Sequence, residues 1–158
     1  MNEYILVDNQ SDLDDETKAL LDKAEGALPT AYAPYSNFRV AAAILLNDGT
    51  VVTGTNQENA AYPSGMCAER VALFTASSQH PGKTIKKIVV LARLGDEPRL
   101  APASSCGSCR QVMLEFEQRQ HTPYEVVMQH QDGRWVKTSS AQTLLPFCFS
   151  NESLQVRK

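Results

Sequence analysis

Two short cysteine motifs constrain this chain of 158 residues more than any other feature. Residues 67–70 read CAER and residues 106–109 read CGSC, and each tetrapeptide begins a segment with the apolar spacing of a helix. Helix N-termini carry unpaired N–H groups and a partial positive charge, which favour a thiolate over a thiol. Three thiols therefore lie at or near two helix starts, and bringing their thiolates together requires a cation.

Zn²⁺ suits such a set of ligands, because it prefers a tetrahedral arrangement of sulfur and nitrogen. Structural zinc sites close with a fourth protein ligand, whereas catalytic sites keep one position for water. Here the motifs supply Cys67, Cys106 and Cys109, with Glu69 two residues after the first cysteine. This is the layout of the zinc deaminases, in which the glutamate is an acid and base and not a ligand.

The composition favours one domain over residues 1–158, with an N-terminal arm at 1–11 and a polar C-terminal tail at 150–158. Hydrophobic residues make up 42% of the chain, which is enough to build a substantial core. A net charge of −3 gives no bulk attraction for nucleic acid. The sequence shows neither an apolar run of about 18 residues nor a secretion leader, so we expect no membrane partner and a cytoplasmic location.

Apolar periodicity and turn residues predict alternating helices and strands. This order predicts an α/β fold with three layers, in which helices cover both faces of a mixed sheet of five strands. The expected helices span 13–28, 67–78 and 107–118, and the expected strands span 38–46, 50–55, 85–93, 124–129 and 134–138.

The N-terminal region gives two more local expectations. Ser11 or Asp12 is placed to cap the first helix, since both residue types accept hydrogen bonds from orphan N–H groups. Residues 4–7 form a short apolar run that is either an edge strand or a docking arm.

Five segments in order resemble the cytidine deaminases of the small, three-cysteine type. The resemblance covers roughly residues 13 to 153, and a single Cys-x-x-Cys would carry far less weight than five motifs at similar spacings. The segments are 33–38 (APYSNF), 56–62 (NQENAAY), 67–70 (CAER), 106–111 (CGSCRQ) and 144–149 (LLPFCF).

This resemblance implies a cytidine-deaminase-like fold and one zinc ion per chain, held by Cys67, Cys106 and Cys109 with water in the fourth position. Zinc lowers the pKa of such a water from 15.7 toward about 7. Glu69 would move protons between the water, N3 and the amino group of cytosine. The implied reaction is the hydrolysis of cytidine and deoxycytidine to uridine, deoxyuridine and ammonia in pyrimidine salvage.

Arg70 has its own physical argument. Three thiolates and Zn²⁺ sum to a charge of −1, which disfavours hydroxide at the metal. A guanidinium beside Glu69 can donate to two sulfurs and offset that charge. The alternative is an ordinary surface arginine, and the neighbouring cysteines favour the first interpretation.

The resemblance also implies nucleoside contacts. Asn56 and Glu58 would hold the ribose 3′-hydroxyl, Phe38 would line the pyrimidine, and the N–H of Ala68 would contact the base. Free nucleosides are the expected partners, because the sequence contains no glycine-rich phosphate loop.

Three-cysteine members of the family are similar in forming homotetramers whose active sites are completed across subunits. Phe149 matches an aromatic residue that reaches a neighbour's pocket, and Tyr62 matches a residue near the same boundary. The resemblance therefore implies a homotetramer in which both residues help to bind substrate.

Two positions depart from the family pattern. Ser105 stands where proline usually precedes the second zinc cysteine, so the chain regains an N–H and a freer φ there. Ala41 replaces a usual glycine in the first strand, which is a small change in packing.

Other functions stay open from the sequence alone. The enzyme can act on another aminopyrimidine nucleoside, such as a nucleoside antibiotic. The chain can also be a non-catalytic module that binds zinc or nucleosides. A thioredoxin-like redox pair at Cys106 and Cys109 is a third interpretation, but it leaves the 67–70 motif unexplained.

Overall fold

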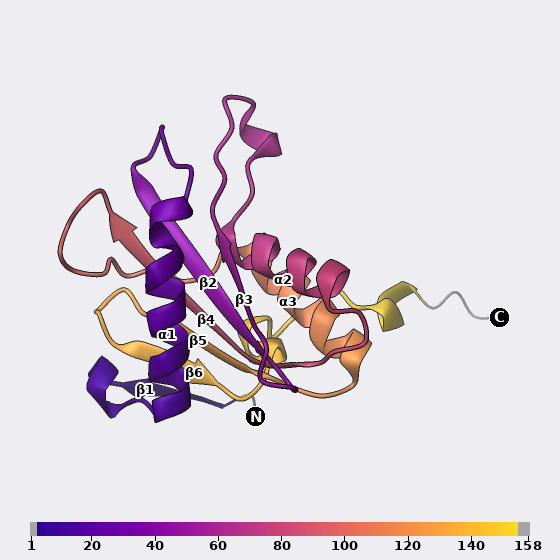
Figure 1. Ribbon diagram of the computed structural model, residues 1–158. Coiled ribbons are helices and arrows are strands. Elements are labelled where there is room, and N and C mark those ends of the chain that lie inside the picture. Colours follow the sequence, from indigo (N-terminus) through magenta and orange to yellow (C-terminus); the bar gives the residue numbers. More distant parts are fainter. Residues whose placement is uncertain (1–2, 155–158) are drawn as a thin grey trace.

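The computed structural model describes residues 3–154, which are arranged around one mixed sheet (Figure 1). Its strands are β1 (Tyr4–Val7), β2 (Phe38–Leu46), β3 (Val51–Thr55), β4 (Ile85–Leu94), β5 (Glu125–Gln129) and β6 (Trp135–Thr138). Within this described range the strand order is β1-β6-β5-β4-β2-β3. The pair β4 and β5 is parallel, and the other neighbours in this order are antiparallel.

The α/β class expected from the sequence is confirmed, but the expected count of five strands is wrong. The sheet described between residues 3 and 154 has six strands, because β1 pairs with β6 from Tyr4 opposite Thr138 to Val7 opposite Trp135. Of the two interpretations of residues 4–7, the edge strand is therefore correct. Residues 1–2 of the expected arm and 155–158 of the expected tail lie outside the described residues.

Helices cover both faces of the sheet (Figure 1). Helix α1 (Asp15–Ala27) lies on one face, while α2 (Ala68–Gln79) and α3 (Gly107–Gln120) lie on the other. Successive strand residues point to opposite faces, so Ala42 and Val90 join the core under α2 and α3, and their neighbours Ala41 and Val89 join the core under α1. Among residues 3–154, no helix is both long and apolar enough to cross a membrane.

Helix α1 begins later than the sequence suggested. Neither Ser11 nor Asp12 caps it, because both belong to a short 3₁₀ turn. Asp14 is the cap, and its Oδ1 accepts a hydrogen bond from the Thr17 N–H at 2.8 Å. The same carboxylate binds two lysines of the sheet, and these long-range contacts explain why this acidic residue was selected over the others.

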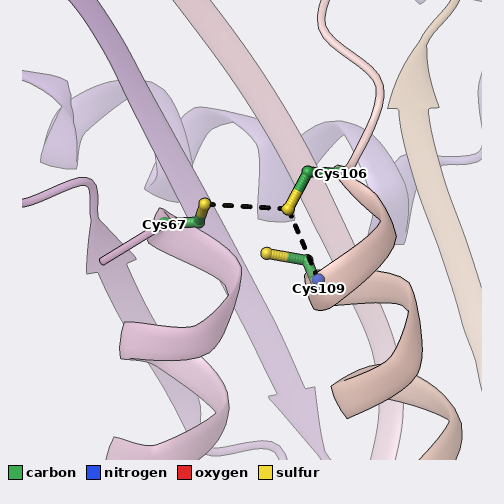
Figure 2. Close-up of side chains that lie close together, drawn as sticks. All are labelled: Cys67, Cys106 and Cys109. Atoms are coloured by element: carbon green, nitrogen blue, oxygen red, sulfur yellow. Dashed lines mark hydrogen bonds between the residues drawn. The ribbon is translucent and has the colours of Figure 1, made fainter. Parts of the chain in front are cut away.

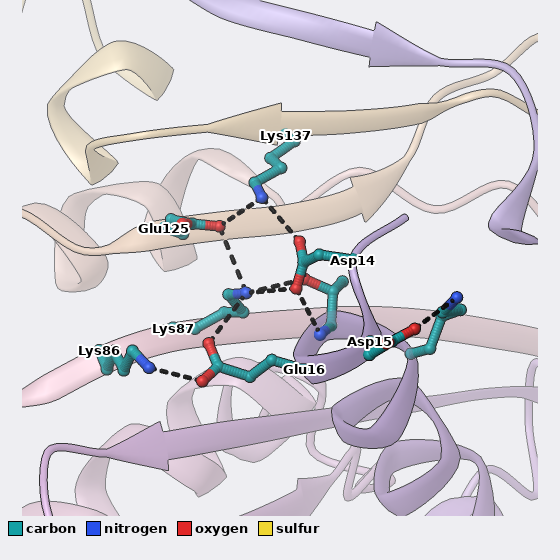
Figure 3. A network of polar contacts seen from close by, with 9 residues as sticks. Asp14, Asp15, Glu16, Lys86, Lys87, Glu125 and Lys137 are labelled. Carbon is teal, nitrogen blue, oxygen red and sulfur yellow. Dashed lines mark hydrogen bonds and ion pairs between the residues drawn. The ribbon is translucent and has the colours of Figure 1, made fainter. Parts of the chain in front are cut away.

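An ion network fastens the start of α1 to β4, β5 and β6 (Figure 3). The Lys87 side chain is only 3% exposed, and its Nζ lies 3.1 Å from Asp14, 3.2 Å from Glu16 and 3.4 Å from Glu125. Lys137 Nζ bridges Asp14 at 2.8 Å and Glu125 at 3.0 Å. A buried cation without such partners is strongly destabilising, so this network fixes where α1 crosses the sheet.

Strand β3 sets the position of α2 on the opposite face. A Cβ atom at Gly54 would lie 2.4 Å from the Ala72 nitrogen and 2.7 Å from the Ala68 carbonyl oxygen. Only glycine allows the strand and the helix backbone to approach so closely. The first turn of α2, which follows Cys67 directly, is thereby held against the sheet.

Candidate metal and active site

Three thiols meet between the N-terminal ends of α2 and α3. Figure 2 shows the side chains of Cys67, Cys106 and Cys109 directed into one small space. Cys67 is the N-cap of α2 and Cys106 is the N-cap of α3. Their Sγ atoms lie 3.9 Å apart, and all three Sγ atoms lie within 4.8 Å of one another.

This cluster fits one zinc ion. Two sulfurs bound tetrahedrally at about 2.3 Å from a common zinc lie about 3.8 Å apart, close to the 3.9 Å between Cys67 and Cys106. All three residues are free cysteines, so no disulfide competes for the sulfurs. Three sulfur ligands leave one position of a tetrahedron for a further ligand, as in catalytic zinc sites.

The electrostatics of the thiols show why a cation is needed there. Hydrogen bonding from Cys109 and then from Arg70 outweighs burial and lowers the pKa of Cys67 to about 5. The pKa of Cys109 is raised instead, because its S–H donates a hydrogen bond to the Cys67 sulfur and burial disfavours a second negative charge. One thiolate therefore forms readily, while deprotonation of the next requires a compensating positive charge.

Arg70 lies beside the sulfurs, and of the two sulfur contacts expected from the sequence the structure gives a hydrogen bond to one. Its Nη2 donates a hydrogen bond to Cys67 Sγ at 3.6 Å. Contact with Cys67 raises the pKa of the Arg70 guanidinium, so the group stays cationic. Its Nε is buried and has no hydrogen-bond partner among the described residues.

Glu69 is a buried carboxyl in the first turn of α2, only 4% exposed. Burial raises the pKa of this carboxyl. The position two residues after Cys67 places the group beside the metal cluster, yet the cluster that could hold a metal contains only the three cysteines. The geometry thus places one buried carboxyl beside three sulfurs that could hold a metal.

The cluster opens into a cavity of about 410 Å³. This volume lies within the range of small-molecule sites. The lining includes most residues that the sequence selected: Phe38, Asn56, Glu58, Tyr62, Cys67, Ala68, Glu69, Arg70 and Cys106. Cys109 is fully buried behind the wall, and Phe149 is not among the lining residues.

Two loops form the outer wall of the cavity, and Figure 1 shows both extending beyond the same end of the sheet. One precedes β2 and the other joins β3 to α2. They are bound side by side, because the Tyr32 N–H donates to the Asn56 carbonyl at 3.0 Å and the Glu58 N–H donates to the Tyr32 carbonyl at 2.8 Å.

The side-chain amide of Asn56 makes two hydrogen bonds to the backbone of β2. Its Oδ1 accepts from the Val40 N–H at 2.8 Å, and its Nδ2 donates to the Phe38 carbonyl at 2.9 Å. Since an amide has two donor hydrogens, one N–H of Asn56 remains for a ligand. The side chain is therefore held in one orientation before any ligand arrives.

Several cavity residues were not selected from the sequence. Tyr35, Met66 and Ser104 line the space, and Ser36 binds the lining residue Glu58. A signal was present for two of them, because Tyr35 and Ser36 belong to the same short segment as Phe38. Met66 immediately precedes the CAER motif and Ser104 lies two residues before CGSC, so nearness to the cysteine motifs was the signal available for them.

Comparison with known proteins gives a consistent result. Residues 14–124 match the family model described as the cytidine and deoxycytidylate deaminase zinc-binding region. A cytidine deaminase of Sporosarcina psychrophila is 38% identical over 139 residues, which cover 88% of this chain and 95% of that protein. One from Halalkalibacterium halodurans is 45% identical over 101 residues, covering 64% and 72% of the two chains.

Solved structures agree with these relatives. The crystal structure of cytidine deaminase from Burkholderia pseudomallei superposes with a TM-score of 0.69 at 41% identity, covering 87% of this chain and all of that chain. The structure of the Mycobacterium tuberculosis cytidine deaminase superposes with a TM-score of 0.66 at 31% identity, covering 87% and 99%.

Proposed function

Because this chain belongs to the cytidine and deoxycytidylate deaminase family, we propose that it is a zinc-dependent hydrolase that deaminates cytidine and deoxycytidine. The products are uridine or deoxyuridine and ammonia. One observation carries the proposal: three thiols converge at the wall of a cavity of nucleoside size, with the buried Glu69 carboxyl beside them. A redox pair at Cys106 and Cys109 accounts for neither Cys67 nor Glu69.

Cys67, Cys106 and Cys109 would hold the metal. A zinc ion bound there supplies an acidified water molecule for attack at C4 of the pyrimidine. Glu69 would accept one proton from the attacking water and deliver it to N3. It would then move the remaining proton of that oxygen to the amino nitrogen, so that the C4–N bond breaks and ammonia leaves as the C4 carbonyl forms.

Arg70 and the helix starts support this chemistry electrostatically. The guanidinium offsets negative charge on the sulfurs, and the partial positive charges of two helix N-termini act in the same direction. Phe38 lines the base side of the cavity, and the N–H of Ala68 donates to the base. Asn56 and Glu58 bind the 3′-hydroxyl of the sugar.

The assembly proposed is a homotetramer that works in cytoplasmic pyrimidine salvage. Large apolar side chains near the cavity and at the C-terminal segment support an assembly, because Tyr62 is 85% exposed, Phe147 is 96% exposed and Phe149 is 59% exposed in a single chain. In this assembly Phe149 and Tyr62 complete the pocket of a neighbouring subunit. Light scattering on the active protein should give four chain masses, and an active monomer would contradict it.

The function is tested by measuring ammonia release from a panel of cytosine compounds. Cytidine and deoxycytidine should be turned over, whereas free cytosine and CMP should react far more slowly. Cytosine lacks the sugar hydroxyl that Asn56 and Glu58 would bind, so it loses those hydrogen bonds, and no phosphate loop compensates CMP. Equal turnover of CMP and cytidine would assign the cavity to nucleotides instead.

A further inference from the structure

Glu58 is held by three hydrogen bonds from the neighbouring loop before any ligand is present. Its Oε2 accepts from the backbone N–H of Tyr35 at 2.9 Å and from that of Ser36 at 3.3 Å. Its Oε1 accepts from the hydroxyl of Ser36. An ionised carboxylate offers about four acceptor positions, so one position on Oε1 remains.

The direction of the Ser36 hydroxyl bond is fixed by its second partner. The Phe38 N–H donates to Ser36 Oγ at 3.0 Å. A backbone N–H is always the donor, so Oγ accepts there and its single proton is directed to Glu58. Hydrogen bonding from this hydroxyl, followed by the two backbone N–H groups, outweighs desolvation and lowers the pKa of Glu58, which keeps it a pure acceptor.

The two proposed sugar-binding residues therefore have few hydrogen-bond donors and acceptors left for a ligand. Asn56 retains one N–H donor and Glu58 retains one acceptor position on Oε1. One donor and one acceptor together complement one hydroxyl group, which both accepts and donates. The pair has no capacity of this kind left for a second hydroxyl.

We propose that Ser36 is a positioning residue that sets the sugar specificity of this enzyme by holding Glu58 in the orientation that accepts one sugar hydroxyl. This inference rests on the proposed function, since it assumes that the cavity takes a cytosine nucleoside. The remaining donor and acceptor fit one hydroxyl, and under the proposed function that group is the 3′-hydroxyl, so its loss should matter more than the loss of the 2′-hydroxyl. Ser36 acts through Glu58 and not on the reacting atoms.

The test compares Ser36→Ala with wild type on cytidine, 2′-deoxycytidine and 2′,3′-dideoxycytidine. Hydrogen bonds to charged groups correspond to about ten- to hundredfold in an equilibrium constant, so kcat/KM should fall by about that factor for the two substrates with a 3′-hydroxyl. The loss should appear mainly in KM, because the sugar contact is equal in ground and transition states. For the dideoxynucleoside the loss should stay below about twofold.

Matched variants separate positioning from folding. Ser36→Thr keeps the hydroxyl and should restore most of the activity, while Ser139→Ala makes the same chemical change at an exposed turn and should leave all three substrates unaffected. If Ser36 acts through Glu58, the double variant Ser36→Ala/Glu58→Gln should be no worse than Glu58→Gln alone. Ser36→Cys replaces the hydroxyl with a weak donor of similar size, so its loss in kcat/KM should resemble that of Ser36→Ala.

Where dideoxycytidine reacts slowly, competitive inhibition by uridine and by 2′,3′-dideoxyuridine replaces turnover as the readout. Equal weakening of both inhibitors, or equal loss on all three substrates, would overturn the role of Ser36. Wild-type protein that releases ammonia from no cytosine nucleoside would instead remove the proposed function on which the inference rests.

Discussion

The sulfur atoms of Cys67 and Cys106 lie 3.9 Å apart, although each belongs to the N-terminal end of a different helix. This separation matches two ligands on one tetrahedral zinc. Cys109, one turn into α3, completes the set. The arrangement makes the metal content of the protein the first quantity to measure.

We predict one zinc per chain, lost when any of these three thiols is removed. Metal analysis of Cys106→Ala should show most of the zinc gone, because two sulfurs do not complete a zinc site. Cys148→Ala is the matched control. Cys148 lies outside the cluster, so this variant should keep its full zinc content. Full zinc in Cys106→Ala would remove that residue from the ligand set.

Glu69→Gln should keep zinc and fold but lose nearly all turnover. The amide has the size of the carboxyl but cannot accept and return protons. A general acid–base group contributes about 10²–10⁴-fold, and a group used in two transfers should reach the upper figure. Glu115→Gln, on the exposed side of α3, is the control, and near-normal turnover by Glu69→Gln would exclude the proposed role.

Acid should destabilise the protein partly through Asp14. Desolvation opposes ionisation of this carboxyl, but hydrogen bonds from Lys137, Thr17 and Lys87 outweigh it and hold its pKa well below the ordinary 3.8. For a lowered pKa, the added stability is fully present above the ordinary value and is lost as the pH falls below it. Urea unfolding followed from neutral to acid pH should therefore show a falling midpoint.

Asp14→Asn separates the charge from the helix cap, because asparagine also caps helices well. This variant should be less stable at neutral pH and show a flatter pH dependence than wild type. Asp15→Asn removes a carboxylate that is 99% exposed and should change little, as expected for a surface ion pair. An unchanged slope in Asp14→Asn would show that other carboxyls control the acid response.

Ser105→Pro should raise the melting temperature slightly. The Ser105 hydroxyl does not cap α3, since Cys106 is the N-cap. Its buried Oγ has no partner at ordinary hydrogen-bond distance among the described side chains, although it lies near enough to Glu69 to oppose the rise in the pKa of that carboxyl. The N–H donates only to the thioether sulfur of Met128 at 3.4 Å. Fixing φ at a compatible position stabilises by about 0.4–1 kcal/mol, which exceeds the weak bond that proline deletes.

Ser105→Ala serves as the control for that change, because it removes the hydroxyl but keeps the N–H and the freer φ. Ser105→Pro should melt at a higher temperature than both Ser105→Ala and wild type, and it should release zinc to a chelator more slowly. A lower melting temperature with faster zinc release would show that the serine N–H is needed in this chain.

Part of the metal cluster was predictable because its information is local. The positions of CAER and CGSC at two helix starts are visible in the sequence, whereas the meeting of the two motifs across 39 residues was implied by the family resemblance and depends on the sheet. The start of α1 was not predictable in the same way. Ser11, Asp12 and Asp14 can all cap a helix, and the choice of Asp14 follows from Lys87 and Lys137, which come from distant strands.

The sixth strand was left undecided and the loop contacts of the cavity were missed for the same physical reason. Tyr4–Val7 is a strand because β6 lies beside it, and these segments are separated by most of the chain. Glu58 was selected from its motif, but the hydroxyl that holds it comes from Ser36 in a different loop. Periodicity reports which face is buried, not which distant side chain will supply a hydrogen bond.

Strand β4 has a consequence for the order of events during synthesis. It lies between the two cysteine motifs in sequence and between β2 and β5 in the sheet. A ribosome adds about 5–20 residues per second, so Cys67 leaves it several seconds before Cys109. Until β4 has paired with β2, nothing holds the two helix starts at their final separation. The nascent chain thus carries the Cys67 thiol without a complete metal site while residues 68–109 are added, and zinc can bind all three sulfurs only after Cys109 has emerged.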